Sequence, residues 1–251
     1  MINMPPPLLK MENVTVNFDG FKALTDISIN ILPCALRVLI GPNGAGKSTL
    51  CDTIIGRVRP TTGKIWFKED LITSLSEPEI VRRGICRKFQ TPGVLPSLSV
   101  MDNLLVSVRK NRAWWHAMTR KIPKAEQTRA EEILEMIGLE NRRHVLAANL
   151  AHGEKQWLEI GMVVGTDSDL LLLDEPTAGM GPQDTQRTAD LILSLIDRHA
   201  VLVIDHDMSF VEALNGYTTV LHQGRILKEG SVAEVRADAQ VEAVYLGRAK
   251  E

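Results

Sequence analysis

Short segments that alternate apolar and polar residues open the chain, and longer helical patterns follow them. A period of two residues is typical of β-strands with one buried face. Five early segments fit that pattern or form short apolar runs bounded by turn residues. We therefore expect a small sheet formed by the segments before residue 41, and two further strands after the helix that follows. The expected strands are Val14–Val16, Ile27–Ile31, Leu36–Ile40, Gly63–Lys68 and Gly84–Gln90.

The pattern changes to helical spacing from about Val94 to Gly165. Apolar residues recur three or four positions apart, as at Leu104 and Val108 and again at Ile133 and Ile137. Such spacing places the apolar side chains on one face of a helix. The segment therefore predicts a helical subdomain inserted into the chain.

Two continuous apolar runs follow, Leu170–Leu173 and Val201–Ile204, with the helical segment Thr185–Ile196 between them. Strands that are apolar on both faces are typical of parallel sheets covered by helices. In the C-terminal tail, two short apolar segments on either side of Gln223-Gly224 predict a hairpin that turns at these two residues. Ser231 then precedes Glu234 by three positions, which is the spacing of a helix capping box. The core is expected to be parallel α/β.

Composition narrows the class of protein. The 251 residues can bury a sizeable core, and 29 basic against 31 acidic residues give a net charge of −2. Without a block of like charge, we expect no nucleic-acid partner. Three scattered cysteines without a CxxC pair favour a reducing compartment. No segment approaches the ~18 apolar residues of a membrane span, and the N-terminus does not resemble a signal peptide.

A glycine-rich segment after Leu36–Ile40 matches the phosphate-binding pattern GxxxxGK[ST]. It reads GPNGAGKST and opens the helical stretch Ser48–Ile55. Backbone N–H groups of such a loop turn toward a phosphate, and the helix N-terminus adds partial positive charge. Lys47 can reach phosphate oxygens, and the Ser48 hydroxyl can ligate Mg²⁺. The predicted nucleotide-binding residues are Gly41, Pro42, Asn43, Gly44, Ala45, Gly46, Lys47, Ser48 and Thr49.

Two adjacent carboxylates end the run Leu170–Leu173. In an open parallel sheet this edge faces the ligand crevice, beside the phosphate loop. Because side chains alternate along a strand, we expect Asp174 and Glu175 to point to opposite sides. We assign Asp174 to the Mg²⁺ shell and Glu175 to the base that polarises the attacking water. The segment Asp205–Asp207 is not interpreted as a metal site, because no second His or Cys cluster lies at ligand spacing.

The order of these motifs resembles the ABC-transporter ATP-binding family. The phosphate loop is followed by Gln90, by LAHGE at 150–154, by LLLLDEP and by His206. The resemblance covers nearly the whole chain. It implies an α/β fold with a P-loop NTPase parallel-sheet core, an N-terminal antiparallel β subdomain and an inserted helical subdomain. The implied ATP-binding domain spans 8–251, with a β subdomain and P-loop core at 8–93, a helical subdomain at 94–165, a core segment at 166–222 and a C-terminal hairpin and tail at 223–251.

Further residue roles are implied by the resemblance alone. Gln90 would bridge Mg²⁺ and the attacking water, and His206 would hold the γ-phosphate. Phe18 would stack on adenine, and Phe21 is the second candidate for this contact. Both phenylalanines could equally be core residues. In this family the signature segment opens a helix that contacts ATP bound to the opposite subunit, in a head-to-tail dimer. The signature residues here are Ala151, His152, Gly153 and Glu154.

The sequence departs from the family pattern at three positions. Ala151 stands where a serine hydroxyl usually contacts the phosphate, Glu154 where glutamine is usual, and Gly181 where an aspartate commonly crosses the dimer interface. A hydrogen bond to a charged group contributes about 1.5–3 kcal/mol to binding. This is small compared with the combined binding energy of the many contacts that the loop makes to the phosphates. We expect a working but slower ATPase, with altered coupling between the two sites.

Within the family, the signature variant, Glu159–Met162 and the ending Val244–Arg248 resemble importers of the branched-chain amino-acid type. Residues 152–162, together with Gly84–Gln90, look most like the urea-importer branch. We therefore expect an ATP-hydrolysing subunit that powers import of urea or a short-chain amide. A branched-chain amino-acid importer ATPase is the first alternative. The others are a lipid-export subunit, a soluble ABC ATPase of repair or translation, and an adenylate-kinase-like enzyme with a phosphate acceptor.

The resemblance also implies ATP and Mg²⁺ as cofactors. The implied partners are membrane permease subunits, a second identical or homologous ATP-binding subunit and, indirectly, a solute-binding protein. The chain would then lie peripherally at the cytoplasmic face of the inner membrane. The pair Trp114-Trp115 in a basic segment could face a partner or lipid headgroups, or could pack locally.

Overall fold

The structure, a computed structural model, describes residues 5–87, 93–109 and 122–246. Its first sheet is antiparallel and has the strand order β2-β1-β4-β5. In the register of this sheet, Leu9 faces Ile31 on one side and Phe67 on the other, and all three are buried. The expected N-terminal sheet is thus confirmed for Val14–Val16 and Ile27–Ile31, and the separate strand expected at Gly63–Lys68 joins the same sheet. Its strands are β1 (Leu9–Phe18), β2 (Phe21–Ile31), β4 (Thr62–Phe67) and β5 (Asp70–Leu71).

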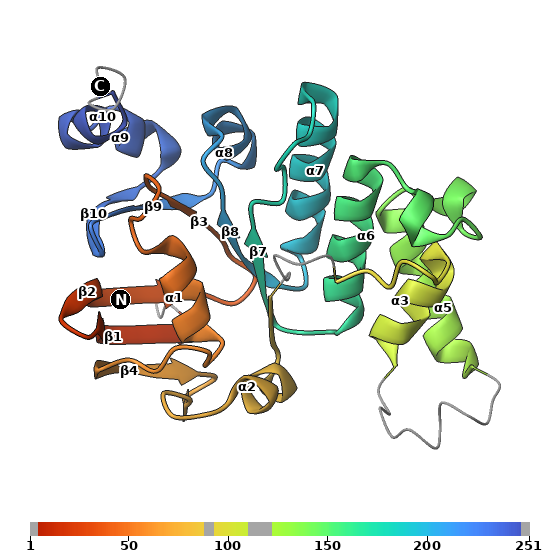
Figure 1. Cartoon of the computed structure of the whole chain (residues 1–251), viewed down its shortest axis with the longest axis horizontal. Coiled ribbons are helices and arrows are strands. Elements are labelled where there is room, and N and C mark those ends of the chain that lie inside the picture. The colour runs from red at the N-terminus through yellow and green to blue at the C-terminus, as the bar shows by residue number, and fades with distance from the viewer. Residues whose placement is uncertain (1–4, 88–92, 110–121, 247–251) are drawn as a thin grey trace.

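The second sheet runs through the middle of the molecule in the order β10-β9-β3-β8-β7-β6 (Figure 1). Neighbouring strands are parallel except for the β9–β10 hairpin. Leu36–Ile40 belongs to this sheet, so its expected place in the N-terminal sheet is wrong. The run is apolar because both faces are covered, as is usual for parallel strands. The strands are β3 (Leu36–Ile40), β6 (Ile85–Arg87), β7 (Leu170–Asp174), β8 (Ala200–Ile204), β9 (Tyr217–His222) and β10 (Arg225–Gly230).

Two hydrophobic cores cover the two faces of the six-stranded sheet. Leu170 and Leu172 of β7 join the core shared with the antiparallel sheet, whereas Leu171 and Leu173 join the opposite core. The first core includes α1 (Lys47–Ile54), and the second includes α6 (His152–Gly165). Helices α1 and α6 therefore lie on opposite faces of the sheet, and Figure 1 shows them well apart. Helices α7 (Pro182–Leu195) and α8 (Met208–Leu214) also pack in the second core.

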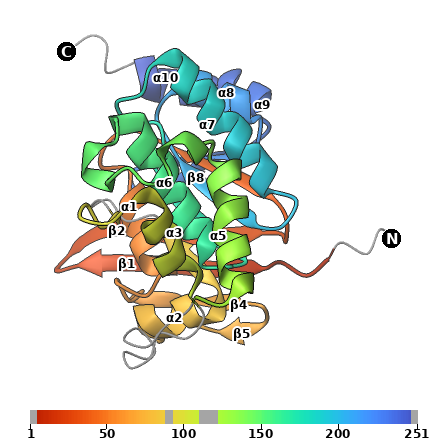
Figure 2. The same cartoon turned by 90° about the vertical axis from the view of Figure 1, so that its right-hand side faces the viewer.

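The inserted helical part lies at the opposite end of the long axis from the antiparallel sheet (Figure 1). Helices α3 (Val100–Val108), α5 (Lys124–Met136) and α6 pack on one another (Figure 2). Two glycines allow their close approach, because a Cβ at Gly161 would lie 3.0 Å from Ile137 Cδ1 and one at Gly165 only 2.1 Å from Ser107 Oγ. The helical pattern expected from Val94 begins at Val100.

The turns and caps explain where several elements start and stop. The expected hairpin turn is confirmed, with φ of 48° at Gln223 and 72° at Gly224. The capping box that begins with Ser231 is confirmed and opens α9 (Val232–Arg236). The helix expected at Thr185–Ile196 begins earlier, at Pro182, since proline suits the first helical position. Among the described residues, the remaining helices are α2 (Glu77–Arg83), α10 (Ala239–Leu246) and the 3-10 turns Glu140–Arg142 and Ala147–Asn149.

In the part of the chain that the structure describes, no helix is long and apolar enough to cross a membrane. Trp114 and Trp115 lie outside the described residues.

Candidate functional site

The glycine-rich loop connects β3 to α1 and is held by close backbone packing. Gly41 has φ of +155° and Gly46 has φ of +105°, a region that favours glycine. A Cβ at Gly41 would lie 2.2 Å from the backbone oxygen of Leu221, and one at Gly46 would lie 2.7 Å from that of Ala23. Strands β2 and β9 thus support the loop, and a side chain at either glycine would displace it.

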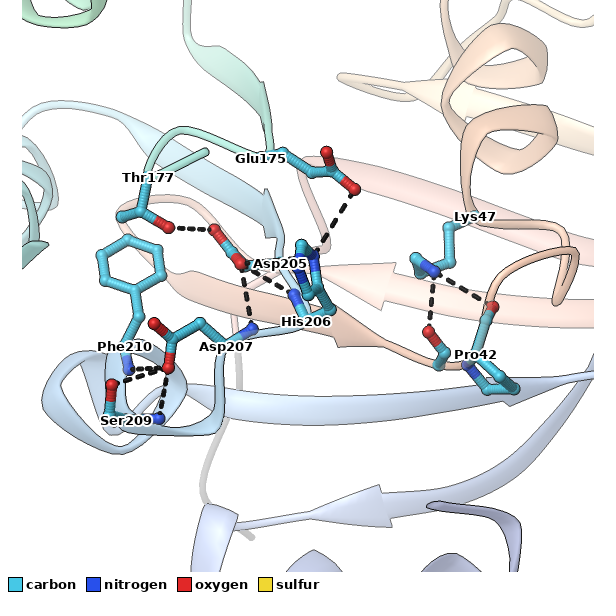
Figure 3. Close-up of polar contacts among 10 residues, drawn as sticks. Pro42, Lys47, Glu175, Thr177, Asp205, His206, Asp207, Ser209 and Phe210 are labelled. Atoms are coloured by element: carbon cyan, nitrogen blue, oxygen red, sulfur yellow. Dashed lines mark hydrogen bonds and ion pairs between the residues drawn. The ribbon is translucent and has the colours of Figure 1, made fainter. Parts of the chain in front are cut away.

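Lys47 lies over this loop. Its Nζ donates to the backbone oxygens of Gly41 at 2.7 Å and Pro42 at 3.1 Å (Figure 3). The first turn of α1 contains no acidic side chain, so nothing within that turn offsets the partial positive charge of the helix N-terminus. Ser48 is exposed in the same turn. The loop therefore presents an ammonium group, a hydroxyl and a helix N-terminus, which is a combination suited to phosphate.

Three strands bring the other predicted groups to the same edge of the sheet. Strands β7 and β8 are parallel neighbours, as are β8 and β3, so their carboxyl ends meet where the glycine-rich loop begins. Asp174 ends β7, and His206 follows shortly after β8. Figure 3 shows Glu175, His206 and Lys47 in one region of the molecule. The sheet order thus gathers residues that are far apart in sequence.

Asp174 and Glu175 have very different surroundings. The Asp174 side chain is 5% exposed, and its Oδ2 accepts from Arg87 Nη2 at 2.7 Å. The Glu175 side chain is 47% exposed. Strand alternation does not separate the two, because β7 ends at Asp174 and Glu175 has φ of +46°. Strand alternation was the expected reason for their different surroundings, and this expectation is wrong. The left-handed backbone conformation at Glu175 directs its side chain instead.

His206 approaches Glu175 and is positioned by a residue that sequence reasoning missed. His206 Nδ1 lies 3.6 Å from Glu175 Oε1. The buried Asp205 accepts from the backbone N–H groups of His206 at 2.7 Å and Asp207 at 3.0 Å, and from Thr177 Oγ1 at 2.7 Å (Figure 3). Asp205 directly follows a buried strand, as Glu175 does. This position in the sequence could have indicated that Asp205 belongs to the site.

The signature segment opens α6 as expected. Ala151 is the N-cap and has no side-chain oxygen to accept from the first turn. Glu154 supplies half of a capping box, since its Oε2 accepts from Ala151 N at 2.9 Å and its Oε1 from Arg142 Nε at 2.8 Å. Partial burial opposes ionisation, but these two hydrogen bonds and the Arg142 charge lower the pKa of Glu154. The acid thus stabilises the helix start.

A contact joins the signature segment to the loop after Glu175. His152 Nε2 lies 2.8 Å from the backbone oxygen of Ala178. A Cβ at Gly153 would lie 3.2 Å from Asp184 Oδ2, which is tight. Gly181 is exposed, and a Cβ there would meet nothing within 4 Å, so the fold itself does not require glycine at this position.

The aromatic residues expected to stack on adenine lie at the tip of the β1–β2 hairpin. Phe18 and Phe21 pair across the hairpin and are 48% and 69% exposed, so the alternative of core aromatics is wrong. Ala23 on the same strand packs against Gly46 of the phosphate loop, which places the hairpin beside the loop. Gln90 lies outside the described residues.

Comparisons with known proteins show the family of the chain. The family described as ABC transporter matches residues 24–178. The branched-chain amino acid transport ATP-binding protein LivG of Escherichia coli K12 is 32% identical, over 98% of this chain and 100% of its own length. BraF of Pseudomonas aeruginosa, with the same description, is 31% identical over the same shares.

Solved structures agree as well. An ATP-binding cassette of an ABC transporter in its ADP conformation aligns with a TM-score of 0.83 and 30% identity, over 97% of this chain and 100% of that chain. A nucleotide-free cassette aligns with a TM-score of 0.82 and 30% identity, over 95% and 98%. The expected fold is confirmed. The chain belongs to the ABC transporter family, in which it is an ATP-binding, ATP-hydrolysing subunit.

Proposed function

We propose that this chain powers an importer of the branched-chain amino-acid type. The observation that supports this most is the full-length similarity to LivG and BraF, both described as high-affinity branched-chain amino acid transport proteins. These relatives favour the branched-chain alternative over the urea or short-chain amide prediction, which they do not support. Since a permease and a binding protein choose the cargo, the substrate assignment rests on kinship rather than on a pocket of this chain.

The residues of the site fit ATP with Mg²⁺. The glycine-rich loop leaves no room for a Cβ at Gly41 or Gly46 because strands β2 and β9 lie against it, so these strands hold the loop at the N-terminus of α1, where a phosphate would bind. Ser48 and Asp174 offer hard oxygen donors, and Mg²⁺ is usually held by one or two such groups together with substrate phosphates. When bound, the ion would neutralise charge on the phosphates.

Within this arrangement Glu175 is the proposed base. Its exposed carboxylate can reach a water molecule, whereas Asp174 is engaged by Arg87. His206 beside Glu175 would hold the γ-phosphate, and Asp205 positions the backbone of that histidine. Gln90 would orient the same water, and Phe18 would stack on adenine.

A second ATP-binding subunit is part of the proposal. The signature helix α6 packs on the face of the sheet opposite to α1, so Gly153 cannot be the partner of its own phosphate loop without rearrangement of the core. A head-to-tail pair would instead bring each signature segment to the loop of the other copy. Permease subunits would use that closure, a solute-binding protein would deliver cargo, and the chain would sit peripherally at the cytoplasmic face of the membrane.

Hydrolysis and cargo need separate tests. Glu175→Gln should slow ATP hydrolysis by roughly 10²- to 10⁴-fold, since one general base is lost, while retaining ATP binding and favouring a stable dimer. Wild-type turnover in this variant would refute the assignment of the base.

For the cargo, cells that lack this chain should lose uptake of labelled leucine and regain it with the wild-type chain but not with Glu175→Gln. Uptake of labelled urea serves as the competing measurement. Restored urea uptake with unaffected leucine uptake would reverse the cargo assignment in favour of the amide.

A further inference from the structure

A buried arginine joins three elements around the proposed magnesium ligands. Arg87 ends β6 and is 5% exposed. Its Nη1 donates to Asp52 Oδ1 at 2.5 Å, and its Nη2 donates to Asp174 Oδ2 at 2.7 Å. Asp52 lies on α1 four positions after Ser48, and residues four apart share a helix face. One guanidinium thus ties the helix of the phosphate loop to the strand that ends in Asp174.

The guanidinium makes both ion pairs through its terminal nitrogens. In the described part of the chain, Arg87 Nε is the buried side-chain nitrogen that has no hydrogen-bond partner. A buried donor left unsatisfied weakens folding, so the position is not optimised for stability alone. The planar fork of arginine reaches two carboxylates at once, which the point charge of lysine does not.

We propose that Arg87 is a positioning residue that holds Asp174 in place and tunes how strongly this site binds a divalent cation. The inference rests on the proposed role of Asp174 in the Mg²⁺ shell. A fixed positive charge on one oxygen of this carboxylate opposes a cation bound to the same group. The ion pair also fixes the orientation of the carboxylate at the end of β7. The arginine therefore lowers cation affinity while keeping the geometry that hydrolysis requires.

Asp52 moderates this effect by sharing the guanidinium. Without the Asp52 charge, Arg87 would pair with Asp174 alone, and the site would also lose a negative charge. Removing Arg87 and removing the Asp52 charge should therefore shift cation affinity in opposite directions. An ion pair that only stabilises the fold predicts lower thermal stability in both variants and no opposite shift.

The test measures Mn²⁺ binding to the purified full chain with saturating ADP, by the electron paramagnetic resonance signal of unbound Mn²⁺. We expect Arg87→Met to lower the dissociation constant about 3- to 10-fold, and Asp52→Asn to raise it about 2- to 5-fold, from charge interactions across several Å at intermediate dielectric. Lys68→Met is the matched control, because Lys68 pairs with Asp169 just before the other end of β7. Its Mn²⁺ affinity should equal that of the wild type.

A second readout separates positioning from charge. Arg87→Lys keeps the charge but loses the fork, so it should bind Mn²⁺ within about 2-fold of wild type while single-turnover ATP hydrolysis falls about 10-fold. Arg87→Met should also hydrolyse more slowly although it binds Mn²⁺ more tightly. If Arg87→Met does not fold, Asp52→Asn still tests the charge effect, because unchanged Mn²⁺ binding in it would contradict the proposal, and Arg87→Lys still tests positioning through its rate of hydrolysis.

Shifts in the same direction for Arg87→Met and Asp52→Asn, or unchanged hydrolysis in Arg87→Lys, would overturn the proposal. Asp174→Asn distinguishes this failure from a failure of the metal assignment. If Asp174→Asn weakens Mn²⁺ binding but the Arg87 variants behave as wild type, only the role of Arg87 is wrong. If Asp174→Asn leaves Mn²⁺ binding unchanged, the proposed magnesium site itself is wrong.

Discussion

Replacing Ala151 with serine should stabilise the protein and preserve or increase its ATPase activity. Ala151 is the N-cap of α6 and has φ of −61° and ψ of 161°, the extended conformation that a capping serine adopts. The residue is exposed, so an added hydroxyl is not buried without a partner. The other half of the capping box is already present, since Glu154 accepts from the backbone N–H of Ala151.

The size of the effect follows from known N-cap energetics. Serine at an N-cap is favoured over alanine by about 0.5–2 kcal/mol, and commonly by about 1 kcal/mol. For a protein of this size, 1 kcal/mol raises the midpoint of thermal unfolding by roughly 2–4 °C. The same hydroxyl adds a hydrogen-bond donor at the position from which the family contacts phosphate, which is the reason to expect at least wild-type hydrolysis.

Thermal unfolding followed by circular dichroism, together with steady-state ATP hydrolysis, measures both effects. Ala243→Ser, at an exposed position within α10, is the matched control, because serine inside a helix is slightly less favourable than alanine. A midpoint that is unchanged or lower in Ala151→Ser would refute the capping argument. A large loss of hydrolysis with a raised midpoint would show that the phosphate contact is made differently here.

Two further predictions concern the same cassette. Because the folded-state pKa of Glu154 lies below the ordinary value of 4.5, its stabilisation is complete above that pH and is lost as the pH falls through the folded-state pKa. The stability difference between wild type and Glu154→Gln, measured by urea unfolding, should therefore shrink on acidification, and a difference independent of pH would contradict the argument. Gly46→Ala should abolish binding of a fluorescent ATP analogue and destabilise the fold by about 1–3 kcal/mol, because its Cβ meets a backbone oxygen. Gly44→Ala, where a Cβ meets nothing within 4 Å, should destabilise the fold by only the milder cost of a positive φ, and an equal loss of stability in the two variants would refute the steric reason.

Much of the fold could be predicted from local patterns. Apolar runs such as Leu170–Leu173 indicate strands covered on both faces, as the structure shows, and a glycine-rich loop before a helix predicts a phosphate site. Short elements were harder to predict, because a few residues carry little periodicity. Helix α2 was missed although Ser76 and Glu79 have capping-box spacing, which was the available signal.

Which sheet a strand joins could not be predicted from its pattern. The segment Leu36–Ile40 follows two antiparallel strands in sequence, yet it pairs with β8 and β9, whose residues come more than a hundred positions later. Strand pairing depends on the packing of both sheets and on α1 between them. The apolar and polar pattern of one strand indicates only whether one or both of its faces are buried, and not which strands it pairs with.

The sequence by itself determined the chemistry that is available: a phosphate loop, an acidic strand end, a histidine after the next strand and an altered signature. Each depends on spacing within a few residues, where covalent geometry already fixes what neighbouring groups can reach. The tertiary structure decided which groups act together. Arg87 meets partners 35 and 87 positions away, and α6 lies on the sheet face opposite to α1. Such contacts arise only when distant strands become neighbours in one sheet, because burial of their apolar faces, and not their spacing in the chain, brings those side chains together.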